Sequence, residues 1–220
     1  MIINKIKRGE LNFEVRENTL DEWVVDEVLA KGCYLKPLEV NERDKVLDIV
    51  MNIGAFSVLA AYHGAYVIGF EPCEKNYNQA KKNMQLNDFS YPIYQLGISD
   101  ETKDIELYLN EKKNRGNHST TKFRGRRGVT IKCIGINEVL YEYRPTKVKI
   151  DCEGEEYKII MAVDDWYNVE VIRMEWHRRI LKDEANIKFL NMIDKLERDG
   201  FDVIAKRDGK GWTQMITAKK

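Results

Sequence analysis

The chain has 220 residues and a mass of 25.8 kDa, which suffices for one domain with a sizeable core and is short for two. Charged residues make up 33% and hydrophobic residues 43% of the sequence, which excludes a disordered or fibrous protein. Because 36 basic residues balance 36 acidic ones, no overall charge attracts the chain to nucleic acid or membranes, and such a partner would need a local patch. The four cysteines lack C-x-x-C spacing, which argues against a disulfide framework and a zinc site. The first residues resemble no signal peptide, so we expect a cytoplasmic protein.

The first 43 residues have the pattern of an N-terminal extension. NKIKRGELNFEVRE is typical of a small hairpin, and TLDEWVVDEVLAKG predicts an amphipathic helix with Thr19 as its N-cap. We therefore expect an extension over residues 1–43 that packs on the core, and a larger domain over residues 44–220.

The stretch from Ile49 to Phe70 contains no charged residue and is about as long as a bilayer-spanning segment. It is interrupted by Asn52, Ser57 and His63 and by three glycines, and such polar groups are costly in a membrane. Its β-branched and aromatic residues fall in two blocks around an alanine-rich centre. We therefore predict a buried strand, turn, helix, turn and strand rather than a membrane span.

The sequence after this stretch continues to alternate between strands and helices. It predicts helices over residues 73–87 and over ANIKFLNMIDKLERDG, which ends at Gly200. Further strands are expected at residues 91–98, 104–110, 129–134, 146–151 and 169–176, followed by a C-terminal hairpin. We therefore expect an α/β fold with an open, doubly wound, mostly parallel sheet, one antiparallel edge strand, and helices on both faces.

A polar turn follows the first strand of this region, in DIVMNIGAFS. Asn52 and Gly54 permit a tight turn and a close approach of the backbone to a ligand. The second strand ends at Glu71, 23 residues after Asp48, and ligands of doubly wound sheets bind at the carboxyl ends of the strands. A carboxylate there can accept hydrogen bonds from two ribose hydroxyls. These residues indicate either a nucleoside site or a structural turn.

Five segments follow one another in an order and spacing that chance rarely produces: VLDIVMNIGAFSVLAA, VIGFEPCEKNYNQAKKNMQLN, LGISD, KIDCEGEE and RMEWH. From about residue 44 to 205 they resemble the class I S-adenosylmethionine-dependent methyltransferases, and specifically the FkbM family. The resemblance implies a Rossmann-like seven-stranded sheet that binds S-adenosylmethionine, so that residues 44–220 form a class I methyltransferase domain. The cofactor-binding residues that it implies are Asp48, Met51, Asn52, Ile53 and Gly54 in the first motif, Glu71 at the ribose, Gly97 and Ile98 near the adenine, and also Pro72 and Asp151.

Val50 departs from the family pattern D-x-G-x-N-x-G, because it stands where the first glycine is usual. A valine disfavours a positive φ and adds a branched side chain beside the methionine moiety of the cofactor. The site could tolerate it by a backbone shift, or cofactor affinity could be reduced. A cofactor-free relative without activity is a further possibility.

Acidic residues follow a predicted inner strand in KVKIDCEGEEY. Asp151 ends this strand, where side chains border the ligand crevice, whereas Glu155 and Glu156 are explained by the favourable position of carboxylates at a helix start. RMEWHRR places Glu175 and His177 two residues apart, on one face if the strand continues. Both the D-x-E-G and the E-x-H patterns match the family. We expect Asp151, Glu175 and His177 to be the catalytic residues.

His177 is the first candidate for the base that removes the proton of an alcohol acceptor, if its pKa is near neutrality as usual. Asp151 could instead orient the acceptor or accept the proton itself. A hard cation could bridge Asp151, Glu153 and Glu175. We assign no metal, because class I methyltransferases with D-x-E-G need not use one.

The segment Lys112–Lys132 is strongly basic, since eight basic residues and one acidic residue lie between Glu111 and Lys132. Its glycines and length predict a loop, either simply solvated or acting as a lid that gathers a phosphorylated, sulfated or nucleic-acid acceptor. Phe123 could stack on a base. The N/D-P-P-Y/F signature of amino-directed nucleic-acid methyltransferases is absent near this segment.

The favoured function is S-adenosylmethionine-dependent O-methylation of a hydroxyl on a small molecule or sugar. One alternative is an RNA or DNA methyltransferase that uses the Lys112–Lys132 loop. Another is a non-catalytic binding module that has kept the fold. We expect a small-molecule partner and no membrane, and the sequence does not specify an oligomeric state.

Overall fold

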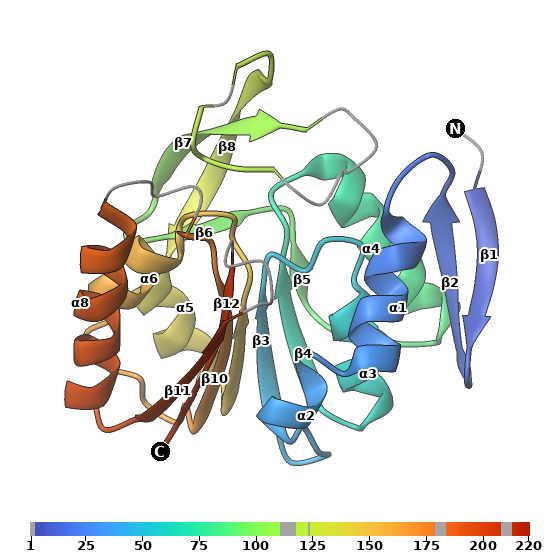
Figure 1. Cartoon of the computed structure of the whole chain (residues 1–220). Coiled ribbons are helices and arrows are strands. Elements are labelled where there is room, and N and C mark those ends of the chain that lie inside the picture. The colour runs from blue at the N-terminus through green and yellow to red at the C-terminus, as the bar shows by residue number, and fades with distance from the viewer. Residues whose placement is uncertain (1–2, 111–117, 123, 179–183, 208–212) are drawn as a thin grey trace.

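A seven-stranded sheet forms the centre of the computed structural model (Figure 1), in the order β11-β12-β10-β9-β3-β4-β5. The structure describes residues 3–110, 118–122, 124–178, 184–207 and 213–220. The strands of this sheet are β3 (Lys45–Ile49), β4 (Tyr66–Phe70), β5 (Ile93–Tyr94), β9 (Lys147–Ile150), β10 (Val171–Trp176), β11 (Asp202–Arg207) and β12 (Gln214–Lys219). Neighbouring strands are parallel except for β12, which is antiparallel to both β10 and β11. The predicted mostly parallel sheet is confirmed, and its reversed strand lies beside the edge strand β11.

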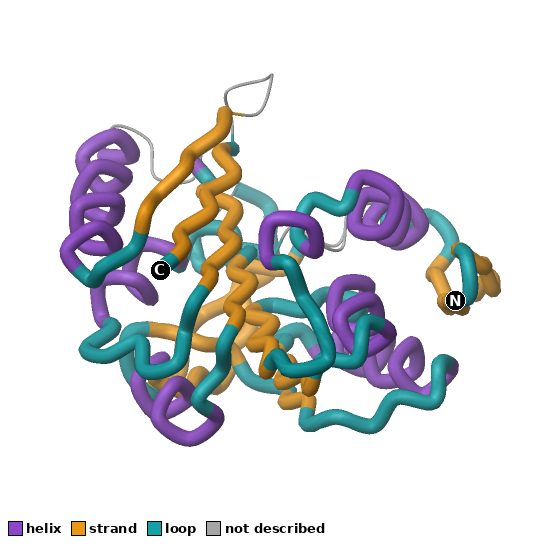
Figure 2. Tube along the Cα trace, turned by 90° about the horizontal axis from the view of Figure 1, so that it is seen from below, coloured by secondary structure: helices purple, strands orange, loops and turns teal. Residues whose placement is uncertain are grey.

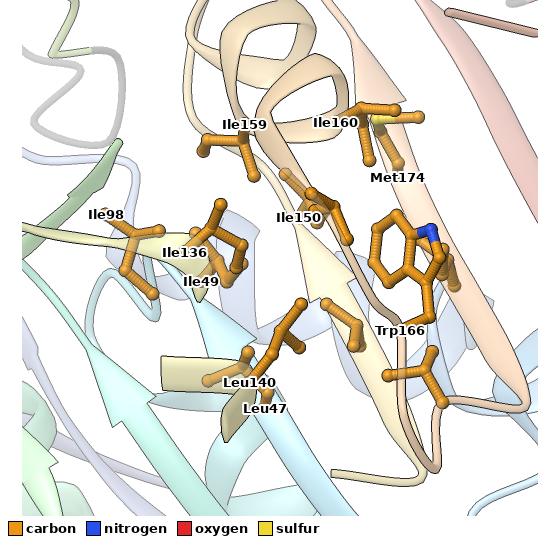
Figure 3. Close-up of a cluster of buried hydrophobic side chains, with 14 of the residues drawn as sticks. Leu47, Ile49, Ile98, Ile136, Leu140, Ile150, Ile159, Ile160, Trp166 and Met174 are labelled. Carbon is orange, nitrogen blue, oxygen red and sulfur yellow. The ribbon is translucent and has the colours of Figure 1, made fainter. Parts of the chain in front are cut away.

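Helices cover both faces of the sheet, as predicted (Figure 1, Figure 2). One face packs against α5 (Ile136–Tyr143), α6 (Glu156–Ala162) and α8 (Ala185–Arg198), and the other against α1 (Asp21–Lys31), α2 (Leu35–Leu38), α3 (Ala55–Tyr62) and α4 (Glu74–Leu86). Successive residues of β3 point to opposite layers, so Leu47 belongs to the core under α5 and Val46 to the core under α3. Figure 3 shows Leu47 beside Leu140 of α5. Helix layers therefore cover both faces of β3, and its residues from Val46 to Ile49 are all buried.

The uncharged stretch Ile49–Phe70 forms the strand, turn, helix, turn and strand that the sequence predicts. It contains the end of β3, all of α3 and all of β4, and α3 is buried from Ala55 to Ala61. None of the helices in the described part of the chain is long and apolar enough to cross a membrane.

A smaller sheet, in the order β6-β8-β7, consists of β6 (Gly97–Ser99), β7 (Lys103–Leu109) and β8 (Arg127–Gly135). The prediction of one strand over residues 91–98 is therefore wrong: Ile93 and Tyr94 pair with β4, whereas Gly97 pairs with Cys133 of β8. A Cβ atom on Gly97 would lie 2.5 Å from the Cys133 sulfur, so only glycine permits this approach.

The basic segment Lys112–Lys132 is not one continuous loop, because residues 127–132 belong to β8 and pair with β7. The strands predicted over residues 104–110 and 129–134 are thereby confirmed, and β8 begins two residues earlier than predicted. Residues 112–117 and Phe123, which carried the expectation of base stacking, lie outside the described residues.

The N-terminal residues form the predicted hairpin and helix, as β1 (Ile3–Arg8), β2 (Leu11–Arg16) and α1. Thr19 is not the N-cap, because that position is taken by Leu20, which has no capping side-chain hydrogen bond. The Thr19 hydroxyl instead donates to Arg16 O at 2.7 Å and accepts from Asp21 N at 3.1 Å, within the turn that precedes the helix. The division of the chain at residue 43 stays a prediction.

Two asparagines, Asn83 in α4 and Asn87 at its C-cap, attach the hairpin to the rest of the fold. Asn87 binds both backbone groups of Asn12, at 2.8 and 2.7 Å. The fully buried Asn83 accepts from Glu14 N at 2.8 Å and donates to Ile53 O at 2.9 Å. Asn83 thereby joins β2, α4 and the turn after β3.

We predict that Asn83→Ala lowers the free energy of unfolding by about 2–3 kcal/mol, because two backbone groups lose their partner in a buried environment. Urea denaturation measures the change. The matched control is Asn78→Ala, since Asn78 is an exposed residue of the same helix. Equal effects of the two substitutions would contradict the bridging role of Asn83.

Candidate functional site

The turn after β3 has an unusual backbone, because Val50, Asn52 and Gly54 all have positive φ angles, of 61°, 54° and 80°. The turn is held by hydrogen bonds from Met51 N to Phe70 O and from Gly54 N to Met51 O. A β-branched residue in the left-handed region is strained, typically by about 1–3 kcal/mol. The structure therefore places Val50 in the conformation that a valine disfavours.

A buried ion pair lies beneath this turn. Asp48 of β3 and Lys149 of β9 are directly paired residues of neighbouring strands, and their charged atoms are 3.1 Å apart. The Lys149 ammonium also donates to Val50 O at 2.7 Å, and the Ser57 hydroxyl donates to the other oxygen of Asp48 at 2.7 Å. Burial opposes the charge of Lys149, but Asp48 and Asp151 outweigh it and raise the pKa of the lysine. The pair thus supports the strained turn from below.

On one side of the turn lies a cavity that we call the Glu71 cavity. Its lining includes Val50, Glu71 and Pro72 from the ends of the strands, and Gly97 and Ile98 from β6. Apolar side chains of the smaller sheet complete it, namely Ile105, Leu107, Ile131 and Cys133. The enclosed volume is about 30 Å³, which is room for a water molecule.

Glu71 is 1% exposed, and its two carboxyl oxygens accept hydrogen bonds from Asn52 N at 2.8 Å and Cys73 N at 2.9 Å. Burial raises the pKa of Glu71 to about 8, despite the opposing effect of these two backbone N–H groups. Its carboxyl group therefore fixes the turn and faces the cavity at the same time.

On the other side of the turn lies the His177 cavity, with a volume of about 230 Å³. Met51 and Asn52 of the turn line it, together with Asp151, Glu175 and His177. The N-terminal residues close it, with Trp23, Val24, Glu27, Val28 and Tyr34 in its wall. The Asn52 side-chain oxygen is buried and has no hydrogen-bond partner among the described residues, so it can accept from a ligand.

His177 is surrounded by carboxylates. Its Nδ1 atom lies 2.7 Å from Glu156 Oε1, and its Nε2 atom lies 3.6 Å from Glu153, 3.7 Å from Asp151 and 3.9 Å from Glu175. Burial by itself lowers the pKa of His177, but Glu156, Glu153 and Asp151 prevail and raise the pKa well above 6.5. The expectation of an ordinary pKa near neutrality is therefore wrong, because the fold brings these carboxylates around one ring.

The structure divides the predicted cofactor residues into three groups. Glu71, Pro72, Gly97 and Ile98 line the Glu71 cavity. Met51, Asn52 and Asp151 line the His177 cavity, with the predicted catalytic residues Glu175 and His177. Asp48, Ile53 and Gly54 line neither cavity and support the turn from behind.

Four further residues shape the site and were not assigned to it from the sequence. Lys149 is buried within β9. Its position in a predicted inner strand could have indicated a buried charge with an acidic partner. Tyr34 donates to Asp151 Oδ2 at 3.1 Å and lies 3.4 Å from Glu175 Oε2. Glu153, considered only as a bridge to a cation, lies within 4 Å of His177.

Glu156 is the fourth, and the explanation by the helix start was incomplete. Its fully buried carboxylate accepts from Gly154 N at 3.0 Å and from Cys152 N at 3.2 Å, and it also binds His177.

We predict that the variant Val50→Gly is more stable than Val50→Ala by about 1 kcal/mol, because glycine alone adopts the left-handed conformation without strain. Both variants remove the branched side chain of valine, so the difference between their free energies of unfolding reports the cost of the left-handed backbone conformation. The same pair of substitutions at Val46, within β3, should show the opposite order. Thermal unfolding of the four variants measures this, and a Val50→Gly variant less stable than Val50→Ala would contradict the strain.

Comparison with known proteins gives the family of the chain. A protein of Methanocaldococcus jannaschii that is named as a candidate ribosomal RNA large subunit methyltransferase is 35% identical over 108 residues. This alignment covers 48% of the chain and 27% of that protein, so the chain spans about a quarter of the length of the relative.

Two solved structures have a similar fold at low sequence identity. The methyltransferase FkbM of Methylobacillus flagellatus is 13% identical with a TM-score of 0.54, and covers 80% of this chain and 43% of its own. TYW2 of M. jannaschii, solved in complex with AdoMet, is 14% identical with a TM-score of 0.52, and covers 99% of this chain and 85% of its own. The methyltransferase FkbM domain model matches residues 48–203, from Asp48 to Val203 in β11. The chain therefore belongs to the FkbM methyltransferase family.

Proposed function

We propose that this methyltransferase transfers a methyl group from S-adenosylmethionine to a hydroxyl oxygen of a small polar acceptor. The observation that carries the proposal is the His177 cavity, which joins the turn residues Met51 and Asn52 to Asp151, Glu175 and His177 in one space. The family membership supports the reaction class, and the site residues support the kind of acceptor.

The side chains that line the two cavities have chemical groups suited to the parts of the cofactor. Glu71 offers a carboxylate for the ribose hydroxyls, and Ile98 offers an apolar contact for the adenine. The unpartnered Asn52 oxygen suits the ammonium of the methionine moiety. Because the Glu71 cavity has a volume of about 30 Å³, adenosine requires its wall, including Ile131 and Cys133 of β8, to move outward.

The bound cofactor supplies a methyl group on a sulfonium, and the residues of the chain position the acceptor and receive its proton. Positioning contributes most in such a displacement. Asp151 and Glu175 border the cavity, and one of them accepts the hydroxyl proton, whereas in the metal-free protein the charged His177 ring orients both. This revises the role expected of His177.

The charge of the His177 cavity favours a neutral or cationic acceptor. Its wall carries Glu27, Asp151, Glu153 and Glu175, against the charged His177 ring and the ammonium of Lys149, which is already paired with Asp48. A phosphate group would be repelled by these carboxylates. A sugar or another polyhydroxyl compound meets acceptors for its hydroxyl protons there.

RNA is the second candidate acceptor, since the M. jannaschii relative is named for ribosomal RNA methylation. The exposed basic residues Lys122, Arg124 and Arg127 lie in the described part of the basic segment, next to Thr120, which lines the Glu71 cavity. They could hold phosphates while one nucleotide enters the site.

We predict that, above about pH 8, Glu71→Gln weakens S-adenosylmethionine binding by about 1–3 kcal/mol, because a charged acceptor of two hydroxyls is lost. Wild-type affinity should rise with pH up to about 8, because the ribose hydroxyls require the deprotonated carboxylate. Isothermal titration calorimetry measures both effects. Glu74→Gln, an exposed neighbour in α4, is the control, and unchanged affinity in Glu71→Gln would place the nucleoside elsewhere.

The same shift has a consequence for the stability of the cofactor-free protein. Folding raises the pKa of Glu71 from 4.5 to about 8, so the folded state binds the proton more tightly and stability from this group falls as pH rises through that window. The variant Glu71→Gln should lose this dependence in thermal unfolding measured from acid to alkaline pH.

The acceptor is tested with radiolabelled S-adenosylmethionine, small hydroxyl compounds and ribosomal RNA. We expect methylation of a small hydroxyl compound, slowed about 10²–10⁴-fold by Glu175→Gln at unchanged cofactor affinity. Glu170→Gln, just before β10 and outside the cavity, is the matched control. Labelling of RNA alone, with binding lost steeply between about 50 and 200 mM salt and weakened by Lys122→Ala and Arg124→Ala, would favour the second candidate. Absence of cofactor binding would leave a non-catalytic module.

A further inference from the structure

The His177 ring has one nitrogen without a hydrogen bond, although the residue is only 6% exposed. Nδ1 is bound to Glu156, whereas Nε2 faces three carboxylates at 3.6–3.9 Å and makes no hydrogen bond among the described residues. A buried imidazole nitrogen that faces carboxylate oxygens across a gap calls for an explanation, and an ion bound between them supplies one.

The spacing of these atoms suits a metal ion. One atom each of Asp151, Glu175 and His177 can be chosen so that all lie within 4.8 Å of one another. Two neighbouring ligands of an octahedral ion with bonds of about 2.1 Å are roughly 3.0 Å apart, and opposite ligands roughly 4.2 Å. Asp151 and Glu175 retain 31% and 26% side-chain exposure, which leaves their carboxylates room to turn toward an ion.

Two positioning residues already orient these groups as metal sites require. The Glu156 carboxylate binds His177 Nδ1 at 2.7 Å, which directs the lone pair of a neutral ring outward from Nε2. The Tyr34 hydroxyl lies at Asp151 Oδ2 and Glu175 Oε2, so the other oxygens, Asp151 Oδ1 and Glu175 Oε1, turn toward Nε2. Glu156 and Tyr34 thus hold the three candidate ligands in orientations that leave one atom of each free to bind an ion.

The charges point the same way. Four carboxylates, of Asp151, Glu153, Glu156 and Glu175, lie within 4 Å of one imidazole ring. One imidazole nitrogen with several carboxylate oxygens is a ligand set for a divalent first-row transition ion rather than for Mg²⁺ or Ca²⁺, which prefer oxygen alone.

We propose that His177, Asp151 and Glu175, with Glu153 beside them, bind one divalent transition-metal ion such as Mn²⁺ in the His177 cavity. In the bound state the His177 ring is neutral, with the Nδ1 proton on the Glu156 side and the Nε2 lone pair on the ion. The ion then borders the space for the acceptor. Its binding does not depend on the proposed methyl transfer.

The probe is Mn²⁺ added to the full chain at neutral pH, without S-adenosylmethionine or acceptor. Electron paramagnetic resonance of the free ion should show one saturable site per chain with micromolar affinity. Crystals soaked in MnCl₂ should give an anomalous difference peak between His177 Nε2 and the carboxylates of Asp151 and Glu175. Mg²⁺ should compete only at much higher concentration.

Variants separate the inner ligands from the surroundings. We expect Asp151→Asn, Glu175→Gln and His177→Gln each to weaken Mn²⁺ binding at least about 10-fold, and Glu156→Gln about 10–100-fold through the ring orientation. Glu27→Gln is the matched control, because Glu27 lines the same cavity but makes no contact within 4 Å with His177. Its affinity should change less than about threefold.

Three results would overturn the proposal: no saturable binding up to about 1 mM Mn²⁺, an anomalous peak elsewhere, or equal affinity in wild type and Asp151→Asn. Where a variant fails to fold, as judged by circular dichroism, the position of the anomalous peak in the wild type decides. Because these readouts need no cofactor, failure of the methyl-transfer proposal and failure of the metal site are distinguishable.

Discussion

The candidate site depends on the buried ion pair between Asp48 and Lys149. The two residues stand opposite one another on β3 and β9, and their side chains are 0% and 5% exposed. Lys149 also holds Val50 O, and Asp48 holds Ser57 of α3, so one pair connects two strand ends, a helix and the strained turn. Loss of one partner in such a pair leaves a buried charge unpaired, which typically costs about 3–5 kcal/mol.

The turn above this pair separates two cavities of different character. The Glu71 cavity is narrow and mostly apolar, and the smaller sheet β6-β8-β7 covers it. The His177 cavity is larger and acidic, and residues from α1 and Tyr34 close it. A ligand that reaches both must pass the turn at Val50, Met51 and Asn52. These three residues lie between the cavities, so the backbone conformation of the turn sets how the two cavities are connected.

The sheet could be predicted because short runs rich in β-branched residues alternate with helical patterns and end in polar residues, as at Glu71 and Asp151. These signals are local. Glu156 and Lys149 were not predicted as site residues, because a charged residue at a helix start or inside a strand is usually solvated, and only the packed fold buries it. The raised pKa of His177 has the same origin, since three of the carboxylates around it belong to residues 151–156, which the fold brings beside the end of β10. The division of residues 91–98 between two sheets depends on β8, some 35 residues further along.

The wall of the His177 cavity contains residues from inside and from outside the range that matches the family model. The family match covers residues 48–203, whereas Trp23, Val24, Glu27, Val28 and Tyr34 precede it and Thr213 follows it. These residues therefore face the turn residues Met51 and Asn52 across the cavity, although they lie outside the matched range. For protein engineering, the N-terminal helix α1 is therefore the place at which the wall of this cavity can be changed outside the residues that match the family.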